Sequence, residues 1–459
     1  MKYLSTRGGQ ASSFKEVLIL GLANDGGLFI PETWPKINIS QLDSNINYID
    51  LTYEIISPFI GDDIPAEILK NIIIKAYKNN FKEKNLVTFK KLSTNEIIVE
   101  LFNGPTLAFK DFAMQLLIPI FDYFLDIEKK KLNLIVATSG DTGSAAINAV
   151  SKSKNLNIFC LFPKDRVSEF QRRQMSTVID EKITLCEIDG TFDDCQNIVK
   201  NILGDTEFSK RYLISAVNSI NWARVMIQVV YYFYAAIKLD GGNSQYNFSV
   251  PTGNFGDVYA GYIAKKMGLN INTLIVATNE NDILDRFLKT GVYSTNQVIK
   301  TSSPSMDIQV ASNFERLLFD LLDRSNDLTT EKMMNLKDYG KITLNKEQLA
   351  KAKELFKSAK ANMDNVKDTI ANIYENDQYL TDPHTAVGVY ALRMTVKNNN
   401  NNFILGTAHP VKFIETVESA VNKKLNLQDQ YSHLFNANEN FLSLSNDSQV
   451  VMNEIIKRN

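Results

Sequence analysis

From about residue 86 onward, the chain alternates short apolar runs with stretches of helical periodicity. Such repeated β-α order is typical of a parallel sheet whose two faces are covered by helices, so we expect an α/β fold. Parallel sheets bind ligands beyond the carboxyl ends of their strands, and the turns that leave the strands are therefore the first places to look for a site. The predicted strands are Leu132–Ala137, Asn157–Phe162, Ile183–Ile188, Tyr212–Ala216, Asn247–Val250 and Ile271–Ala277.

The length of 459 residues is about three times the ~150 residues of a common domain, which predicts a protein of several domains. The stretch 345–376, rich in Lys and Ala, predicts a long amphipathic helix or a pair of helices, and the asparagine run 398–402 predicts a surface loop. The expected parts are a mixed, mostly helical N-terminal domain (1–85), two α/β domains (86–240 and 241–430) and a C-terminal extension (431–459).

Few residues of this chain are suited to metal binding or disulfide formation. The histidines are His384, His409 and His433, and the cysteines are Cys160, Cys186 and Cys195. This scarcity argues against a zinc cluster, a redox pair or a disulfide framework, so we expect no metal and we expect the cysteines to be small buried hydrophobes. Demanding chemistry would then need a bound organic cofactor.

Charge and hydropathy exclude further classes of binding partner. Lys and Arg number 50 against 52 Asp and Glu, and a net charge of −2 indicates no nucleic-acid partner. No charged start followed by an apolar core opens the sequence, and no apolar run approaches the ~20 residues of a membrane span. We therefore expect a cytoplasmic protein with a small-molecule substrate and no membrane partner, assembled as a monomer or a weak homodimer.

The first unusual turn, Thr138–Ala146, follows the strand predicted at 132–137 and consists of small and polar residues. Its glycines let the backbone approach a ligand, its hydroxyls supply donors, and its small residues let the next helix aim its N-terminus at an anion. The turn predicts a site for a carboxylate or a phosphate, with a well-capped turn without ligand as the alternative. Neither a P-loop nor Gly-x-Gly-x-x-Gly is present, which disfavours a nucleotide.

The second unusual turn, Pro251–Asp257, lies between the strand predicted at 247–250 and a helix expected to start near Gly256. Gly253 and Gly256 flank Asn254 and allow successive N–H groups to form a concave phosphate site. A glycine-rich turn without a ligand is the alternative. Two anion-suited loops indicate either one ligand with two anionic ends or a cofactor together with a substrate.

A third element, Asn103–Phe112, links a predicted strand (96–101) to a predicted helix (111–124) and contains Lys110 at the start of the helix. The positive end of the helix dipole disfavours a permanent cation there, and burial among apolar neighbours would lower the pKa of the lysine further. A neutral amine is what imine formation requires. Lys110 is therefore a candidate Schiff-base lysine, with a solvated surface lysine as the alternative.

Short motifs occur along nearly the whole chain in the order of one known enzyme family. They are Met1–Gly8, Leu22–Pro31, Phe102–Thr106, Phe109–Asp111, Thr138–Gly143, Asn218–Asn221 with Arg224, Thr252–Asp257, Ser305–Val310, Ser312–Arg316, Asp382–Ala386 and Thr407–Pro410. The combination resembles the threonine synthases of the longer form, which are pyridoxal-phosphate enzymes of the tryptophan synthase β-like family. The resemblance implies the parallel-sheet core of fold type II, built of two α/β domains.

The resemblance also implies roles for individual residues. Lys110 would hold pyridoxal 5'-phosphate as a Schiff base, and Thr407 would be the hydroxyl partner of the pyridine nitrogen. The cofactor's phosphate would bind Gly253, Asn254, Phe255, Gly256 and Asp257. The substrate's carboxylate would bind Ser139, Gly140, Asp141 and Thr142, and the substrate's phosphate would bind Asn218, Arg224 and Asn254. Asp141 stands where many members of the wider fold have asparagine.

The implied reaction is that of a lyase in threonine biosynthesis: O-phospho-L-homoserine and water become L-threonine and phosphate, by γ-elimination of phosphate and addition of water at Cβ. Since Lys110, the cofactor and the released phosphate would carry the protons, His384 and His409 are expected to be structural. The alternatives are a fold type II phospho-lyase or dehydratase giving 2-oxobutyrate, and a non-catalytic ligand-binding relative.

Overall fold

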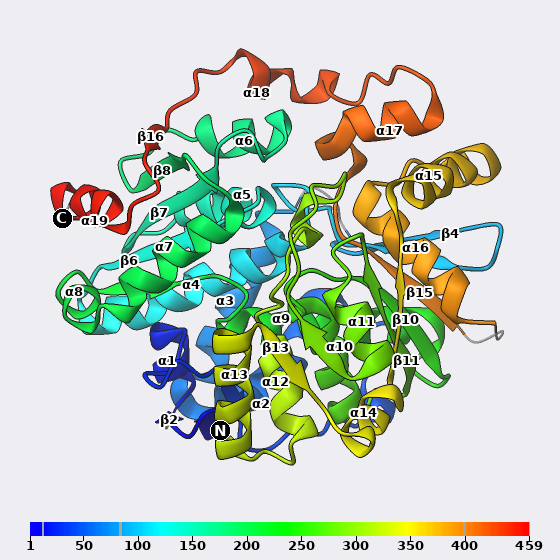
Figure 1. Ribbon diagram of the computed structural model, residues 1–459, viewed down its shortest axis with the longest axis horizontal. Helices are drawn as coiled ribbons and strands as arrows, with labels where there is room; N and C mark the ends of the chain where they lie inside the picture. Colours follow the sequence, from blue (N-terminus) through cyan, green and yellow to red (C-terminus); the bar gives the residue numbers. More distant parts are fainter. Residues whose placement is uncertain (12, 82–84, 398–400, 459) are drawn as a thin grey trace.

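The computed structural model describes residues 1–11, 13–81, 85–397 and 401–458. Within this part of the chain, the strands form two large sheets and two small ones. Figure 1 shows the two large sheets side by side, one at the upper left and one at the right, each flanked by helices. All six strands predicted from the sequence are present in these two sheets, so the α/β expectation is confirmed.

The first large sheet has five strands, and every neighbouring pair in it is parallel. Its second and third inner strands are buried along nearly their whole length, as strands covered by helices on both faces must be. In spatial order the strands are β16 (Leu442–Leu444), β8 (Ile183–Ile188), β7 (Leu156–Pro163), β6 (Leu132–Ala137) and β9 (Ile214–Ala216).

The second large sheet has six strands, parallel except for one antiparallel strand at an edge. In spatial order they are β14 (Phe356–Lys360), β11 (Ile271–Thr278), β10 (Tyr246–Pro251), β15 (Asn401–Gly406), β5 (Ile97–Glu100) and β4 (Thr88–Lys91). A two-stranded ribbon of β12 (Val292–Ser294) and β13 (Lys341–Thr343) lies outside this sheet.

The sheets do not follow the expected domain boundaries at two places. Strands β4 and β5 belong to the expected part 86–240, but they pair within the six-stranded sheet through β15. Strand β16 belongs to the expected C-terminal extension, but it pairs with β8 of the five-stranded sheet. The C-terminal segment, red in Figure 1, crosses the top of the molecule to reach that edge. Each large sheet is thus completed by strands from a distant part of the sequence.

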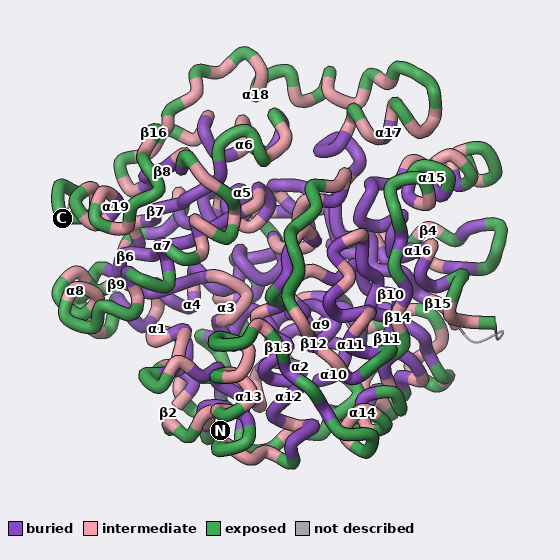
Figure 2. The backbone as a smooth tube through the Cα atoms, viewed as in Figure 1, coloured by how far each residue is buried: buried purple, intermediate pink, exposed green. Residues whose placement is uncertain are grey.

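Helices cover both sheets and form the layer between them, and the buried residues in Figure 2 concentrate there. Around the five-stranded sheet and the interface lie α4 (Lys110–Glu128), α5 (Asp141–Val150), α6 (Glu169–Ser176), α7 (Phe192–Gly204), α8 (Thr206–Arg211), α9 (Trp222–Asp240), α18 (Ser432–Asn436) and α19 (Ser448–Lys457). Around the six-stranded sheet lie α10 (Gly256–Met267), α11 (Ile283–Thr290), α12 (Phe314–Leu321), α13 (Asn326–Tyr339), α14 (Lys346–Lys353), α15 (Met363–Asp377), α16 (Pro383–Thr395) and α17 (Ile414–Val421).

Helix α9 is the central helix of the molecule. Every residue from Trp222 to Ile237 is buried, so the helix is enclosed on all sides, as an almost wholly apolar sequence requires. The few polar side chains on it, Arg224 and Gln228 among them, are therefore held at fixed positions inside the protein.

The N-terminal domain is mixed, as expected, with β1 (Tyr3–Ser5), β2 (Gln10–Ala11), β3 (Phe29–Pro31), α1 (Phe14–Leu20), α2 (Tyr48–Ile60) and α3 (Ala66–Lys78). Ser13 caps α1 by accepting a hydrogen bond from the N–H of Glu16. Arg7 connects the domain to the six-stranded half. Its guanidinium forms a bidentate ion pair with the carboxylate of Glu315 on α12, with N–O distances of 2.8 and 2.9 Å.

The stretch 345–376 departs from the expected helices. The helices α14 and α15 are present, but strand β14 separates them and forms an edge of the six-stranded sheet. Its alternation is short and its outward residues are lysines, which suits an exposed edge but also resembles a helix in composition. Of the asparagine run, 398–400 lie outside the described residues, and Asn401 and Asn402 already belong to β15.

The three cysteines are free thiols buried in the five-stranded half, which confirms their expected role as core residues. Among the described residues, no cluster of His, Cys, Asp and Glu is arranged to hold a metal ion. No helix in the described part of the chain has the length and apolar character that crossing a membrane requires.

Candidate active site

Lys110 is the first residue of α4, and the loop before it is fastened to the helix. The carboxylate of Asp111 accepts hydrogen bonds from the N–H and the hydroxyl of Thr106, at 2.8 and 2.7 Å. The N–H of Phe109 donates to the carbonyl of Thr407 at 2.9 Å, which places β15 beside the start of α4. These contacts hold the backbone of Lys110 in one position, at the helix end where the sequence predicted it.

The side chain of Lys110 enters the interior of the molecule. Its Nζ lies 3.3 Å from Oδ2 of Asp141 and 4.7 Å from the centre of the Phe109 ring. Burial lowers the pKa of Lys110; Asp141 opposes this effect, and the nearby cations Arg224 and Lys412 lower the pKa further. The net effect is a pKa below that of an ordinary lysine, so the neutral amine is easier to reach than on the surface.

The turn between β6 and α5 brings Asp141 to this lysine. The hydroxyl of Thr138 accepts hydrogen bonds from the N–H groups of Gly140 and Gly143, which closes the turn. Gly140 has a φ of 126°, and a side chain there would collide with Gln171. A glycine is required at this point because its backbone is in a conformation that other residues avoid.

Asp141 is buried and has four polar neighbours. Its Oδ1 accepts from Nε2 of Gln171 at 2.7 Å and lies 2.8 Å from Nζ of Lys412, and its Oδ2 faces Lys110 and the hydroxyl of Ser305. Burial alone would raise the pKa of Asp141, but Lys412 and Lys110 hold it well below its usual range. Asp141 is therefore an ionised carboxylate inside the protein.

The turn between β10 and α10 is the third wall of the site. At Gly253, a Cβ atom would lie 2.4 Å from the carbonyl oxygen of Ser305, so two backbones approach closely here. Phe255 caps α10 in the left-handed conformation and packs its ring against Phe314 and Phe356. The N–H groups of the first turn of α10 have no partner inside the helix and are available to an anion.

These three turns line one pocket. Apart from Gly140, every predicted site residue contributes to its wall: Lys110, Ser139, Asp141, Thr142, Asn218, Arg224, Gly253, Asn254, Phe255, Gly256, Asp257 and Thr407. Segments up to about three hundred residues apart thus meet in one place, as the sequence predicted. Residues that the sequence analysis gave no role also line it, among them Ser219, Gln228, Ser305 and His384.

Three buried polar atoms in this wall have no hydrogen-bond partner among the residues that the structure describes: Oδ1 of Asn218, Nε of Arg224 and Oδ2 of Asp257. Burial lowers the pKa of Arg224 to about 10, which still leaves its guanidinium charged at neutral pH. Leaving such groups unpaired in the interior costs free energy, so they indicate the position of a polar ligand.

Asp257 differs from Asp141 in its surroundings. Its Oδ1 accepts hydrogen bonds from the hydroxyls of Tyr231 and Tyr232 on α9, at 2.5 and 3.1 Å. Burial raises the pKa of Asp257 to about 7, although both tyrosines and Lys110 act in the opposite direction. The pocket therefore holds one ionised carboxylate and one that is about half protonated near neutral pH.

Comparison with known proteins is decisive at this point. The chain matches three family profiles, "Threonine synthase N terminus" over residues 2–77, "Pyridoxal-phosphate dependent enzyme" over 85–337 and "Threonine synthase, C-terminal" over 385–456. It is 43% identical to threonine synthase of Pseudomonas aeruginosa, over 97% of this chain and 96% of that protein. The chain belongs to the threonine synthase family.

Other members of the family are similar to this chain over nearly its whole length. Threonine synthase of Saccharomyces cerevisiae is 43% identical, over 92% of this chain and 89% of that protein. The structure of pyridoxal-phosphate-bound threonine synthase from Brucella melitensis superposes with a TM-score of 0.94 at 41% identity, covering 100% of this chain and 99% of that chain. The fold type II core expected from the sequence is thereby confirmed.

The residues present in this family member fit pyridoxal phosphate. A buried lysine with a lowered pKa can bond its aldehyde, and the first turn of α10 can accept its phosphate. The unpartnered atoms of Asn218 and Arg224 remain for a second anion, and Oδ2 of Asp257 remains for a donor. The pocket thus has polar groups for both a cofactor and a substrate.

Sequence reasoning assigned no role to Lys412, and it led us to expect a structural role for His384. Lys412 is buried at the site, and the signal that could have found it is its place two residues after the Thr407–Pro410 motif. His384 lines the pocket, where its Nδ1 lies 2.9 Å from Oδ1 of Asp382 and its Nε2 accepts from the N–H of Ser305 at 3.4 Å. His384 therefore supports the wall of the pocket.

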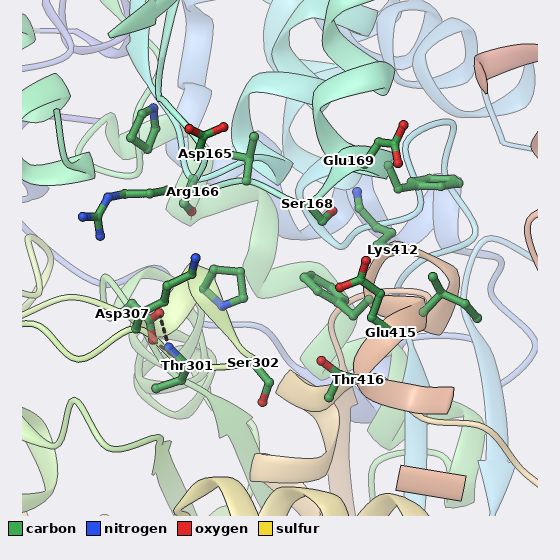
Figure 3. Close-up of a pocket in the computed structure, with 18 of the residues that line it drawn as sticks. Asp165, Arg166, Ser168, Glu169, Thr301, Ser302, Asp307, Lys412, Glu415 and Thr416 are labelled. Carbon is green, nitrogen blue, oxygen red and sulfur yellow. Dashed lines mark hydrogen bonds between the residues drawn. The ribbon is translucent and has the colours of Figure 1, made fainter. Parts of the chain in front are cut away.

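A cleft of about 920 Å³ adjoins the pocket and shares Ser139 and Phe192 with it. Figure 3 shows its two facing walls. One wall carries Asp165, Arg166, Ser168 and Glu169, which belong to the five-stranded half, and the other carries Thr301, Ser302, Asp307, Glu415 and Thr416 from the six-stranded half. The cleft lies between the halves and is wide enough to admit a small substrate.

Proposed function

We propose that this chain converts O-phospho-L-homoserine and water to L-threonine and phosphate, with pyridoxal 5'-phosphate as cofactor. The observation that carries the proposal is the convergence of Lys110, the two anion-suited turns and the guanidinium of Arg224 in one pocket of a threonine synthase family member. A non-catalytic relative would not need a buried lysine with a lowered pKa in this pocket.

Lys110 Nζ would bond the cofactor, and the backbone N–H groups of Gly253, Asn254, Phe255, Gly256 and Asp257 would bind its phosphate. Thr407 lines the pocket beside Lys110 and would be the hydroxyl partner of the pyridine nitrogen. When bound, pyridoxal phosphate supplies an electron sink that stabilises the carbanions of the reaction.

The substrate's two anionic ends would be bound by separate walls of the pocket. Arg224, Asn218 and Asn254 would hold its phosphate, since a guanidinium fork matches phosphate oxygens. Ser139, Thr142 and the N–H group of Asp141 at the start of α5 would bind its carboxylate. Gly140, the other residue expected there, shapes the turn instead, because its N–H already donates to the hydroxyl of Thr138. The carboxylate of Asp141 is ionised and paired with lysines, so its contribution to anion binding would come from its backbone.

Lys110 Nζ would also move the protons. A neutral amine can take a proton from the α-carbon and return one at a neighbouring carbon, and the lowered pKa of Lys110 favours this exchange. The pocket adjoins the cleft at Ser139 and Phe192. Water for the addition at Cβ would enter by that route.

The deciding experiment supplies purified full-length chain with pyridoxal phosphate and O-phospho-L-homoserine and measures the products. Threonine and phosphate in equal amounts support the proposal. The lyase alternative, a phospho-lyase or dehydratase, would release 2-oxobutyrate and ammonia together with the phosphate, in place of threonine. A protein that binds the cofactor but releases neither set of products would point to the non-catalytic alternative.

Replacing Lys110 by alanine should lower kcat by at least about 10³-fold, because the cofactor bond and the proton carrier are lost together. The visible absorbance of the cofactor-lysine bond should disappear as well. Product formation and the absorbance spectrum are measured beside Lys351→Ala, a surface lysine paired with Asp323, which should behave like the parent. A Lys110→Ala protein with normal turnover would contradict the assignment of Lys110 as the cofactor-bonding lysine.

Cytoplasmic localisation and assembly as a monomer or a weak homodimer belong to the same proposal. The localisation rests on the three free cysteines, which suit a reducing compartment, and the assembly rests on the lack of an obvious apolar interface pattern in the sequence. Sedimentation of the full-length chain over a range of concentrations measures the assembly directly. A stable tetramer would contradict it.

A further inference from the structure

The two oxygens of Asp141 are held differently. Oδ1 makes two short contacts, 2.7 Å to Nε2 of Gln171 and 2.8 Å to Nζ of Lys412. Oδ2 makes two long contacts, 3.3 Å to Nζ of Lys110 and 3.5 Å to the hydroxyl of Ser305. One oxygen of the carboxylate is thus held by two short contacts, whereas the other meets Lys110 and Ser305 at longer distances.

Lys412 is the fixed partner. Its side chain has 0% exposure, and its Nζ also donates to the carbonyl of Thr106 at 2.6 Å. It comes from the short helix Pro410–Phe413 after β15 of the six-stranded sheet, whereas Asp141 begins α5 of the five-stranded half. A buried ammonium in this position needs a permanent negative partner, and Asp141 is that partner.

The charges that face Lys110 come from several elements. Asp141 lies on α5, Arg224 on α9, Asp257 on α10 and Lys412 after β15. His384 on α16 lines the same pocket with Nε2 as an acceptor, and the carboxylate of Asp111 is directed to Thr106. Asp141 is therefore the ionised carboxylate in contact with Lys110, and Lys412 balances its charge.

We propose that Lys412 is a positioning residue for this reaction: its fixed charge neutralises Asp141, so that the carboxylate orients Lys110 without retaining a proton on it. The inference rests on the proposed role of Lys110. An Asp–Lys pair presents Lys110 with a polar acceptor and nearly no net charge.

The test measures the basicity of Lys110 in the full-length chain prepared without cofactor. Limiting acetic anhydride labels neutral amines, and mass spectrometry of the peptide containing Lys110 gives the pH midpoint of its labelling. Lys412→Met leaves Asp141 without its counter-charge, so the midpoint should rise by about 1 to 3 pH units. The double variant Asp141→Asn with Lys412→Met removes both charges, and the midpoint should return towards that of the parent.

A second readout follows the capture of added pyridoxal phosphate by its absorbance. Capture needs the neutral amine, so at a pH below the midpoint Lys412→Met should react about tenfold more slowly for each unit of the shift. Lys424→Met is the matched control: Lys424 lines the cleft, is 92% exposed and pairs with Glu418, so both readouts should equal those of the parent. Circular dichroism verifies that each protein is folded.

If Lys412→Met does not fold, Lys412→Gln replaces it, because an amide can still donate to the carbonyl of Thr106 while carrying no charge. An unchanged midpoint in the folded single variant overturns the inference, and so does a double variant shifted as far as the single one. These outcomes are independent of the proposed function, which fails instead if the parent protein forms no threonine.

Discussion

Asp141 and Asp257 occupy matching places in the two halves of the molecule. Each lies in the first turn of a helix that follows a parallel strand, each is buried, and both line one pocket. Their pKa values nevertheless shift in opposite directions: burial raises that of Asp257 to about 7, whereas Lys412 and Lys110 overcome the same effect of burial at Asp141. Both side chains are buried, so the neighbouring charged groups, and not the extent of burial, decide which of the two carboxyls is ionised.

The largest effect should distinguish Asp141→Asn from Asp257→Asn. The first substitution leaves the ammonium of Lys412 buried without its counter-charge, which should cost about 3 to 5 kcal/mol of unfolding free energy. The second replaces a carboxyl that is partly protonated at pH 7 by an amide that can still accept from Tyr231, and should cost at most about 1 kcal/mol, since the amide also avoids the buried charge that Asp257 acquires near that pH. Urea unfolding at pH 7 measures both; equal losses would remove the distinction between the two carboxyls.

The pH dependence of stability should show the same contrast. The folded pKa of Asp257, about 7, lies above the ordinary 3.8, so the folded chain binds this proton more tightly. The contribution of Asp257 to the unfolding free energy should therefore fall between about pH 4 and pH 7, by at most ~4 kcal/mol. At Asp141 the folded pKa is depressed, so its stabilisation is present above about pH 4 and is lost as the pH falls below that value.

Unfolding curves of the parent and Asp257→Asn, recorded from pH 4 to pH 8, isolate this contribution. Other buried carboxyls, such as Asp111 with its pKa raised by burial to about 6, act in both proteins and cancel in the difference. The difference in unfolding free energy between the two proteins should change steadily from about pH 4 to pH 7. Parallel curves would mean that Asp257 is ionised throughout, like Asp141.

The smallest effects should come from the neutral donors. Gln171→Met removes the amide that donates to Oδ1 of Asp141 at 2.7 Å, a bond to an ionised group worth about 1.5 to 3 kcal/mol. Tyr231→Phe removes the hydroxyl that donates to Oδ1 of Asp257, a bond to a partly neutral group worth about 0.5 to 1.5 kcal/mol. Thermal or urea unfolding of the two variants compares them, and a larger loss for Tyr231→Phe would reverse the comparison.

Local signals in the sequence predicted the elements that bear the chemistry. Helix α10 begins at Gly256 as expected, and α4 begins at Lys110, one residue before the expected start, because turn glycines and capping residues act over only a few positions. The carboxyl ends of parallel strands lie at one edge of a sheet, which explains why the turns after β5 and β10 lie near each other. The turn after β6 belongs to the other sheet, and its place in the same pocket was implied by the family resemblance alone.

Contacts between distant residues could not be predicted in this way. Lys412 meets Asp141 across 271 positions and between two sheets, and no local pattern distinguishes a buried lysine from an exposed one. Strand β14 was missed for a related reason: its lysines favour a helix in isolation, and pairing with β11 decides its conformation. The pairing of β5 with β15, and of β16 with β8, crosses the expected domain boundaries and was missed for the same reason, because it depends on residues far apart in the sequence.

The pairing of strands from distant parts of the sequence limits when each sheet can be completed during synthesis. The chain leaves the ribosome from its N-terminus, so β4 and β5 emerge long before β15, their partner in the six-stranded sheet. At the other end, β16 and α19 cover the edge of β8 and the face of α7 only after every strand of the six-stranded sheet has been made. The five-stranded half is therefore not finished before the six-stranded half, and a chain interrupted before residue 442 leaves the edge of β8 without β16 and open to pairing with other chains.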